Sequence, residues 1–331
     1  MSSNQLVSLS NNELLMVMLE LNKISESHTS QSNLNENIID HVLSIPGKQL
    51  RPALTIVCSK LWQEEVDEKV IKMSTAVELL HIATLVHDDT VDFADTRRGE
   101  KTASNIWGPH IAVLVGDFLF ATSAEYVCDT QSIRLIKQFA STSTISDLAK
   151  GQLKEIENKF NIELNMDNYL DIIFKKTGSL FATCSMSGAL LGGAVEEDIN
   201  NVYQFGKNLG LGFQIYDDAL DFEGDEKKMG KPVGSDLKNG VMTLPSIIAS
   251  KKNEKIKKEI INLFELKEEN RNEEVDILVK KITKEGYVEE AKHKASKLID
   301  RSIENISSLK NNNIYKDSLI KLAISSKDRE K

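Results

Sequence analysis

The sequence has little cysteine, proline and excess positive charge. Three cysteines, Cys58, Cys128 and Cys184, and five prolines occur among 331 residues. Three widely spaced cysteines form neither a disulfide framework nor a zinc-ligand pattern, which fits a reducing cytoplasm. Lys and Arg number 41 against 50 Asp and Glu. The net charge of −9 therefore argues against broad nucleic-acid binding and against an anionic membrane surface.

Targeting and membrane segments are not expected either. The first cation is Lys23, so the N-terminus lacks the basic region of a secretory signal. One uncharged run, residues 178–195, is short for a membrane span and rich in Ser, Gly and Ala. We predict a tightly packed buried helix there and no transmembrane segment. No linker rich in Pro, Gly or Ser divides the chain, which predicts one domain over residues 1–331.

Apolar residues recur at helical spacing along nearly the whole chain. We find no alternating strand pattern and no hairpin with a recognisable turn. The predicted fold class is therefore all-α, with helices packed around a core. The part after Leu244 is rich in Lys and Glu, and we expect outer helices over residues 246–331 beside a motif-bearing core at 47–245. The apolar stripe expected on one of these helices comprises Ile256, Ile260, Ile261 and Leu263.

A carboxylate cluster ends the apolar stretch HIATLVHDDTVDFADTRRG, residues 81–99. At about 3.6 residues per turn, His81, Asp88 and Asp92 fall on one helical stripe, and Asp89 lies beside it. Like charges repel, and the C-terminal end of a helix disfavours negative charge. The cluster therefore predicts a bound cation.

A second cluster occurs in GFQIYDDALD, residues 212–221. The side chains that share one helical face there are Gln214, Asp217, Asp218 and Asp221. Oxygen ligands alone suit Mg²⁺, which keeps several waters and binds through a few carboxylates plus substrate phosphates. Two clusters on apolar helices predict two carboxylate patches that face across a cavity. A solvated acidic surface is the alternative interpretation.

Basic residues accompany both clusters. Arg97 and Arg98 follow the first cluster, and guanidinium groups match phosphate oxygens, although a salt bridge to the acids is the alternative. The remaining candidates, from GKQLRP, FKKTGSLF and GKPVGSD, are Lys48, Arg51, Lys176, Thr177 and Lys231. Lys231 would lie on a mobile loop that can close over a phosphate. Structural alternatives are a helix-flanking basic pair, a lysine that extends to solvent, and a plain connector.

These motifs together resemble the trans-isoprenyl diphosphate synthases, the polyprenyl synthetase family. The likeness extends from about Gly47 to about Pro245 and includes GKxxRP, HDDxxD with RRG, KT, GxxFQxxDDxxD and GKxxGxD in the family's order. It implies an all-helical bundle, usually dimeric, around a central cavity. The implied reaction is head-to-tail condensation of isopentenyl diphosphate with an allylic diphosphate, with Mg²⁺ as cofactor.

The resemblance also implies a role for each candidate residue. Mg²⁺ ligands would be Asp88, Asp92 and Asp217, assisted directly or through water by Asp89, Asp218 and Asp221. The allylic diphosphate would be held by Arg97, Lys176, Thr177, Gln214 and Lys231. The isopentenyl diphosphate site would comprise Lys48, Arg51, His81 and Arg98. Taken alone, His81 could instead be a hydrogen-bonded core histidine.

Product length is predicted from the positions before the first aspartate. By the resemblance, Ala83 and Thr84 help to form the cavity floor, where farnesyl-type enzymes often have aromatic residues. These small residues and the uninterrupted DDTVD favour a medium- or long-chain synthase of the kind that makes quinone side chains. Deeper floor residues could shorten the product, and the candidates are Phe118, Phe120 and Tyr126. One departure from the family is Gln152 after Gly151, where glutamate is common.

Several alternatives stay open. The chain could be a short-chain farnesyl or geranylgeranyl diphosphate synthase. We expect a homodimer, and the alternative is the catalytic subunit of a two-component enzyme with a non-catalytic partner. A terpene cyclase or head-to-head synthase should lack the isopentenyl diphosphate site, whose four residues are all present. A non-catalytic subunit should have degraded aspartate motifs, and both motifs are intact.

Overall fold

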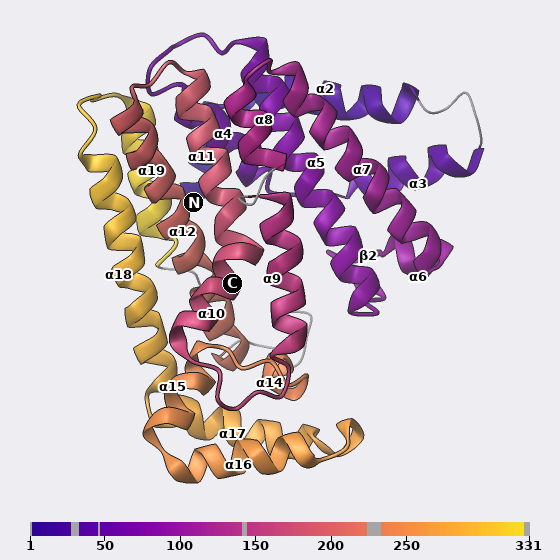
Figure 1. The fold of residues 1–331 in the computed structure, drawn as a ribbon, viewed down its shortest axis with the longest axis vertical. Helices are drawn as coiled ribbons and strands as arrows, with labels where there is room; N and C mark the ends of the chain where they lie inside the picture. The colour runs from indigo at the N-terminus through magenta and orange to yellow at the C-terminus, as the bar shows by residue number, and fades with distance from the viewer. Residues whose placement is uncertain (1, 28–32, 46, 141–143, 224–232, 328–331) are drawn as a thin grey trace. The chain divides into compact units, whose positions relative to one another are not determined.

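A computed structural model describes residues 2–27, 33–45, 47–140, 144–223 and 233–327. The fold is all-α, as the sequence predicts, and in the described part of the chain the strands form a single two-stranded hairpin (Figure 1). That hairpin is a correction, because no hairpin was expected.

Two compact units make up the structure. The first contains residues 1–145, 183–203 and 309–319, and the second contains residues 146–182, 204–308 and 320–331. Four helices supply residues to both units, namely α9 (Ile145–Glu157), α11 (Ser179–Leu191), α12 (Glu196–Glu223) and α19 (Ile314–Ser325). The two candidate aspartate motifs belong to different units, so each is described within its own. A single domain over residues 1–331 stays a prediction.

The first unit is built around α5, which packs against α7, α4 and α2. The elements up to residue 140 are α1 (Ser2–Leu9), α2 (Asn11–Ser27), α3 (Asn33–Ser44), α4 (Leu50–Ser59), α5 (Glu68–Val91), β1 (Thr96–Arg97), β2 (Glu100–Lys101), α6 (Ala103–Trp107), α7 (Pro109–Asp129) and α8 (Ile133–Ala140). Asp67 caps the N-terminus of α5, because its carboxylate accepts from the Lys69 amide at 2.9 Å and satisfies one of the free N-terminal donors. Its residues 73–80 are all buried.

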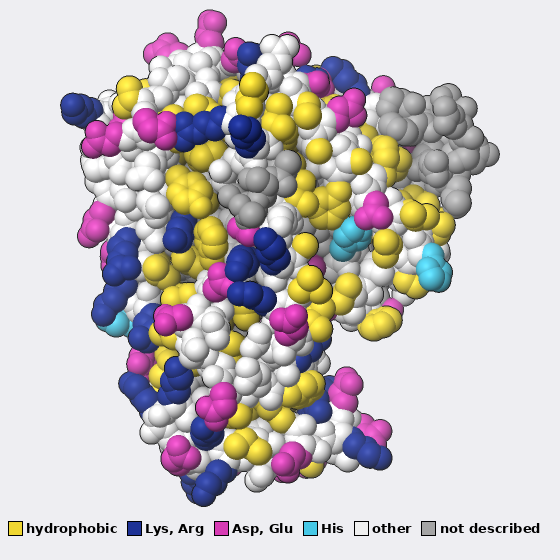
Figure 2. Space-filling view, viewed as in Figure 1, with side chains coloured by type: hydrophobic (Ala, Val, Ile, Leu, Met, Phe, Trp, Pro, Cys, Tyr) yellow, Lys and Arg dark blue, Asp and Glu magenta, His cyan; other side chains and the backbone are white. Residues whose placement is uncertain are grey.

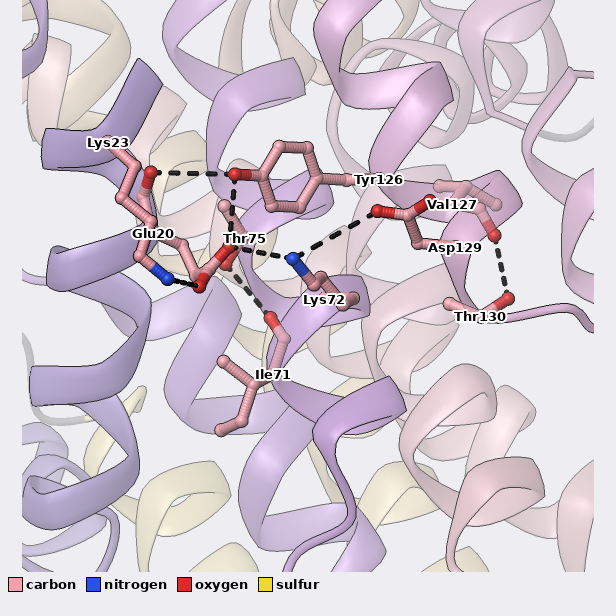
Figure 3. A network of polar contacts seen from close by, with 9 residues as sticks. All are labelled: Glu20, Lys23, Ile71, Lys72, Thr75, Tyr126, Val127, Asp129 and Thr130. Atoms are coloured by element: carbon pink, nitrogen blue, oxygen red, sulfur yellow. Dashed lines mark hydrogen bonds and ion pairs between the residues drawn. The ribbon is translucent and has the colours of Figure 1, made fainter. Parts of the chain in front are cut away.

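A polar network ties three helices of this unit together (Figure 3). Glu20 on α2 accepts from Lys72 on α5 at 2.8 Å and from the Tyr126 hydroxyl on α7 at 3.1 Å. Lys72 also lies 4.8 Å from the centre of the Tyr126 ring. Burial raises the pKa of Glu20, but the bonds from Lys23, Lys72 and Tyr126 outweigh it and lower that pKa to about 2. The network fixes the α7 end that carries Tyr126.

Helix α11 confirms the predicted buried helix in the uncharged run. Residues 179–189 are buried. A Cβ atom at Gly188 would lie 2.2 Å from the Thr55 carbonyl oxygen, so only glycine allows this close approach to α4. Small residues here serve helix packing within the unit.

The second unit consists mainly of helices. They are α9 (Ile145–Glu157), α10 (Met166–Ile173), the π-helix η1 (Phe174–Gly178), α14 (Ser235–Lys238), α15 (Leu244–Lys252), α16 (Glu254–Glu265), the 3₁₀ helix η2 (Glu268–Asn270), α17 (Asn272–Lys284) and α18 (Tyr287–Ser307). The predicted stripe on α16 is confirmed at Ile256, Ile260 and Leu263, which are buried, while Ile261 is half-buried.

On the face drawn in Figure 2, described side chains of both charges are interspersed.

In the part of the chain that the structure describes, two helices, α5 and α7, are long and apolar enough to cross a membrane by length and composition alone. Most of the apolar window of α5 is buried inside the protein, as in any core helix. Helix α7 is less covered and exposes Val113 and Leu114, which are 42% and 63% exposed. Length and composition therefore give only weak support for a membrane span.

Candidate functional site

The first aspartate motif lies at the C-terminal end of α5, as predicted. The helix ends at Val91, and the Asp92 amide still donates to the Asp88 carbonyl at 2.8 Å. Asp89 is buried, Asp88 is half-buried and Asp92 is exposed. The motif therefore presents two carboxylates toward solvent and turns the third into the protein.

Arg97 is the partner of the buried carboxylate. Its Nε donates to Asp89 Oδ1 and Oδ2 at 2.8 and 2.7 Å, and its Nη2 donates to Oδ1 at 2.5 Å. Burial lowers the pKa of Arg97, but the bond to Asp89 and the nearby carboxylates outweigh it and raise that pKa. The salt bridge foreseen as an alternative is thus present, and it fixes the Arg97 side chain.

The hairpin that carries the two arginines was not predicted. Thr96 pairs with Lys101 and Arg97 with Glu100, with Arg98 and Gly99 at the turn. Both turn residues have positive φ, +54° and +88°, as two-residue hairpin turns require. Strands of two residues are too short to produce an alternating pattern. Arg98 is unusual in this conformation, because side chains other than glycine and asparagine are strained there.

Arg51, His81 and Arg98, three residues of the predicted isopentenyl diphosphate site, lie near one another. Burial lowers the pKa of His81, and the positive charges of Arg51, Arg98 and Arg97 lower it further. His81 is therefore neutral at pH 7. Lys48 lies in the same GKQLRP segment with an exposed side chain, and no contact of Lys48 with this cluster is described.

Glu78 is a residue of this cluster that the sequence interpretation missed. It lies one turn before His81 on α5 and is 7% exposed. Burial raises its pKa, while Arg51 and Arg98 act in the opposite direction. A Cβ atom at Gly47 would lie 2.9 Å from Arg98 Nη1 and 3.7 Å from Glu78 Oε1. A single acid within the apolar run MSTAVELL was the signal that could have revealed it.

The second aspartate motif lies on a helix, as predicted, and its place is near the C-terminal end of α12. Asp217 is half-buried, whereas Asp218 and Asp221 are 6% and 1% exposed. Gln214 Nε2 donates to Asp218 Oδ1 at 2.9 Å, and Thr177 Oγ1 donates to Gln214 Oε1 at 2.7 Å. The structure thus brings Thr177, Gln214 and Asp218 together. It also adds Tyr169, whose hydroxyl donates to Asp218 Oδ2 at 2.6 Å and which the sequence interpretation missed.

Asp221 holds the chain segment that follows. Ser235 Oγ donates to its Oδ1 at 3.0 Å, and the Asp236 amide donates to its Oδ2 at 3.1 Å. The Gly234 amide donates to the Asp221 carbonyl at 2.7 Å. The described end of the GKPVGSD loop is therefore anchored to the motif. Lys231 lies outside the described residues.

Lys176 and Thr177 lie on the π-helix η1, a rare conformation that is frequent at functional sites. Lys176 Nζ lies 2.7 Å from Glu155 Oε1 on α9. A Cβ atom at Gly151 would lie 2.8 Å from the Lys176 backbone nitrogen, so only glycine lets α9 approach η1 this closely. The unusual Gln152 has a buried Oε1 without a hydrogen-bond partner among the described residues.

The carboxylate oxygens of the two motifs suit a hard cation that also binds water and substrate phosphates. Both motifs offer carboxylate oxygens only, as Mg²⁺ prefers. Among the described residues, no group of three or more His, Cys, Asp and Glu side chains is placed to hold a metal. Mg²⁺ is commonly bound by one or two carboxylates, with waters and substrate phosphates completing the shell. The two motifs fit that mode of binding.

The residues assigned to chain length have distinct environments. Ala83 is fully buried, and the half-buried Thr84 donates from its hydroxyl to the His81 carbonyl at 2.7 Å. The Phe120 ring packs against the His87 ring, with 5.3 Å between their centres. Tyr126 belongs to the polar network around Glu20 rather than to an apolar core.

The sequence profile described as "Polyprenyl synthetase" matches residues 32–282. The chain belongs to this family. It is 36% identical over 276 residues to solanesyl diphosphate synthase 1, chloroplastic, of Arabidopsis thaliana, with 82% of this chain and 66% of that protein covered.

Two solved structures have the same fold. Heptaprenyl diphosphate synthase from Staphylococcus aureus is 35% identical with a TM-score of 0.89, and 96% of this chain and 98% of that chain are covered. A polyprenyl synthase from Caulobacter crescentus CB15, complexed with calcium and isoprenyl diphosphate, is 30% identical with a TM-score of 0.87, with 99% and 98% covered. The family expected from the motifs is thereby confirmed.

Proposed function

We infer that the chain lengthens an allylic diphosphate by head-to-tail condensation with isopentenyl diphosphate and makes an all-trans polyprenyl diphosphate. The observation that carries this inference is the pair of intact aspartate motifs, each at the end of an apolar helix in a member of the polyprenyl synthetase family. The cluster of Arg51, His81 and Arg98 favours condensation over cyclisation, because a cyclase has no second diphosphate to hold.

We propose Asp88, Asp92 and Asp217 as the direct Mg²⁺ ligands. Asp92 is exposed and Asp88 and Asp217 are half-buried, which supports this role, whereas Asp89, Asp218 and Asp221 are buried. The buried three would then act by orienting the motif or through water. When bound, Mg²⁺ supplies positive charge that stabilises the departing diphosphate and so assists cleavage of the allylic C–O bond.

The chain's own residues would guide the reaction around that bond. We propose that the allylic diphosphate is held by Arg97, Lys176, Thr177, Gln214 and Lys231, whose donors meet the charge that develops on the leaving oxygen. Lys48, Arg51 and Arg98 would hold isopentenyl diphosphate. Neutral His81 can donate one hydrogen bond there without adding charge. The isopentenyl double bond then attacks the allylic cation, and a proton is lost to the released diphosphate.

A medium or long product is the length we propose. Small side chains at Ala83 and Thr84 leave no aromatic barrier directly before the motif. The solanesyl and heptaprenyl names of two related proteins support this length. A farnesyl or geranylgeranyl product is the alternative, in which Phe118, Phe120 or Tyr126 would end the cavity.

We also propose that the chain works in the cytoplasm as a homodimer, or with a non-catalytic partner chain. The exposed apolar side chains Val113 and Leu114 on α7 support an association surface. Sedimentation of the purified chain alone distinguishes the two assemblies, because only a homodimer doubles its mass without a partner. The three cysteines, all unpaired, suit a reducing compartment, although three relatives are named as chloroplastic.

The reaction is tested by incubating the purified chain with labelled isopentenyl diphosphate, Mg²⁺ and either farnesyl or geranylgeranyl diphosphate. We expect a ladder of long prenyl products that is lost in Asp88→Ala. Farnesyl or geranylgeranyl diphosphate as the final product from shorter primers would contradict the proposed length. Folded protein that incorporates no label would contradict activity of the chain on its own.

A further inference from the structure

Tyr169 links two elements of the second unit through its hydroxyl. It lies on α10, is 3% exposed, and donates from its hydroxyl to Asp218 Oδ2 on α12 at 2.6 Å.

Asp218 is held at both oxygens. Tyr169 donates to Oδ2, and Gln214 Nε2 donates to Oδ1 at 2.9 Å. A carboxyl group with a donor at each oxygen cannot rotate without losing a hydrogen bond.

The second bond is itself anchored. Gln214 Oε1 accepts from Thr177 Oγ1 at 2.7 Å, which orients the amide so that its nitrogen faces Asp218. Thr177 lies on η1, which continues directly from α10. Tyr169 and Thr177 thus hold the pair of Gln214 and Asp218 from both ends of one helical segment.

We propose that Tyr169 is a positioning residue, whose hydroxyl holds Asp218 and, through it, Gln214 in the orientation that binds the diphosphate with Mg²⁺. This inference rests on the proposed function of the second motif. Tyr169 touches neither substrate nor metal in this proposal. Its hydroxyl orients the carboxylate of Asp218, as outer hydrogen-bond partners orient the ligands at other metal sites.

A purely structural role makes a different prediction. A buried tyrosine hydroxyl needs a hydrogen-bond partner, and Asp218 could serve only that need. Tyr169→Phe would then lower thermal stability and leave ligand binding unchanged. A positioning role predicts weaker ligand binding in Tyr169→Phe, because the ring still fills its site while the carboxylate becomes free to rotate.

The test measures Mg²⁺-dependent binding of inorganic pyrophosphate to the full chain by calorimetry, together with the Mg²⁺ dependence of turnover. We expect Tyr169→Phe to weaken pyrophosphate binding and to raise the half-saturating Mg²⁺ concentration, each by about tenfold, the lower end for outer partners of metal ligands. Tyr287→Phe, the same change at a half-buried position of the same unit, should alter neither quantity. Thermal unfolding of both variants checks that they are folded.

A second variant examines the other end of the chain of bonds. Thr177→Val should also weaken binding, and Thr177→Ser, which keeps the hydroxyl, should restore it. The double variant of Tyr169→Phe and Thr177→Val should lose less than the product of the two single losses, because both anchors hold one group. Unchanged pyrophosphate and Mg²⁺ affinities in Tyr169→Phe would overturn the proposal. Wild-type protein that binds no pyrophosphate with Mg²⁺ would contradict the proposed function itself, and this inference with it.

Discussion

Arg97 donates to both carboxylate oxygens of Asp89, and this bidentate pair joins the arginine hairpin to the end of α5. The Asp89 side chain is 9% exposed and that of Arg97 is 32% exposed, so the pair is partly shielded from water. The acid that turns away from solvent thereby orients the cation proposed to hold the allylic diphosphate.

Replacing the guanidinium while keeping the charge tests this relationship. Arg97→Lys cannot make the forked contact, so we expect kcat/KM for the allylic diphosphate to fall by about tenfold or more. Steady-state kinetics with varied allylic substrate measures this. The control is Arg134→Lys, which breaks a forked pair with Glu196 at an exposed site and should change kcat/KM by less than about twofold. Equal effects of the two substitutions would refute a special role for Arg97.

Gly47 lets the loop approach the Arg98 side chain. In Gly47→Ala the new Cβ meets the flexible end of Arg98, so the guanidinium must move while the backbone can stay. We expect KM for isopentenyl diphosphate to rise several-fold, with stability within about 0.5 kcal/mol of wild type. Kinetics at varied isopentenyl diphosphate and chemical unfolding provide the two measurements. An unchanged KM would show that the position of Arg98 does not matter for this substrate.

Gly151 makes a closer contact that cannot relax in this way. In Gly151→Ala the Cβ would meet the Lys176 backbone nitrogen at 2.8 Å, so α9 or η1 must shift. We expect a loss of about 1–3 kcal/mol in stability, together with a lower kcat because Lys176 and Thr177 move with η1. Urea unfolding and steady-state rates test both. Full activity in a destabilised variant would show that the position of η1 does not affect kcat.

Much of this arrangement was predictable from the sequence. Helical spacing placed both motifs on helices, because a 3.6-residue period extends through HIATLVHDD and GFQIYDDAL. The division of labour among the aspartates was not predictable. Whether Asp89 or Asp88 faces solvent depends on the Arg97 contact, and Asp221 is occupied by Ser235 and Asp236, which lie 14 and 15 residues later.

Other features depend on conformations that leave no pattern. The π-helix at Lys176 adds one residue to a turn, which a periodic sequence does not reveal. In the sequence, Tyr169 is indistinguishable from the apolar positions of YLDIIF. Its hydrogen-bond partner Asp218 is 49 residues away, so local spacing does not reveal the contact. Glu78, in contrast, could have been found as an isolated acid in an apolar run.

Asp218 predicts a pH dependence of stability without Mg²⁺. Burial, then the charge of Asp236, raises the pKa of Asp218 to about 7, although Tyr169 and Gln214 act against this. In the unfolded chain this pKa is about 3.9. Between these values only the folded protein holds the proton, so this group makes stability fall as pH rises from about 4 to about 7.

The substitution Asp218→Asn isolates that contribution. The free energy of unfolding of the variant, relative to that of wild type, should therefore increase from pH 5 to pH 8. The increase should be about 1.4 kcal/mol for each pH unit up to the folded-state pKa of Asp218. Urea unfolding in EDTA at both pH values measures the difference. A stability difference between variant and wild type that is the same at pH 5 and pH 8 would disprove a raised pKa at Asp218.

The central claim is that each turnover joins one isopentenyl unit and releases one diphosphate. The most direct measurement counts both in the same reaction: label incorporated from isopentenyl diphosphate and inorganic diphosphate released from an allylic primer. The account predicts a ratio of one, with both signals lost in Asp217→Ala. Diphosphate released without incorporated label would contradict it, and would instead indicate cyclisation or hydrolysis of the allylic substrate.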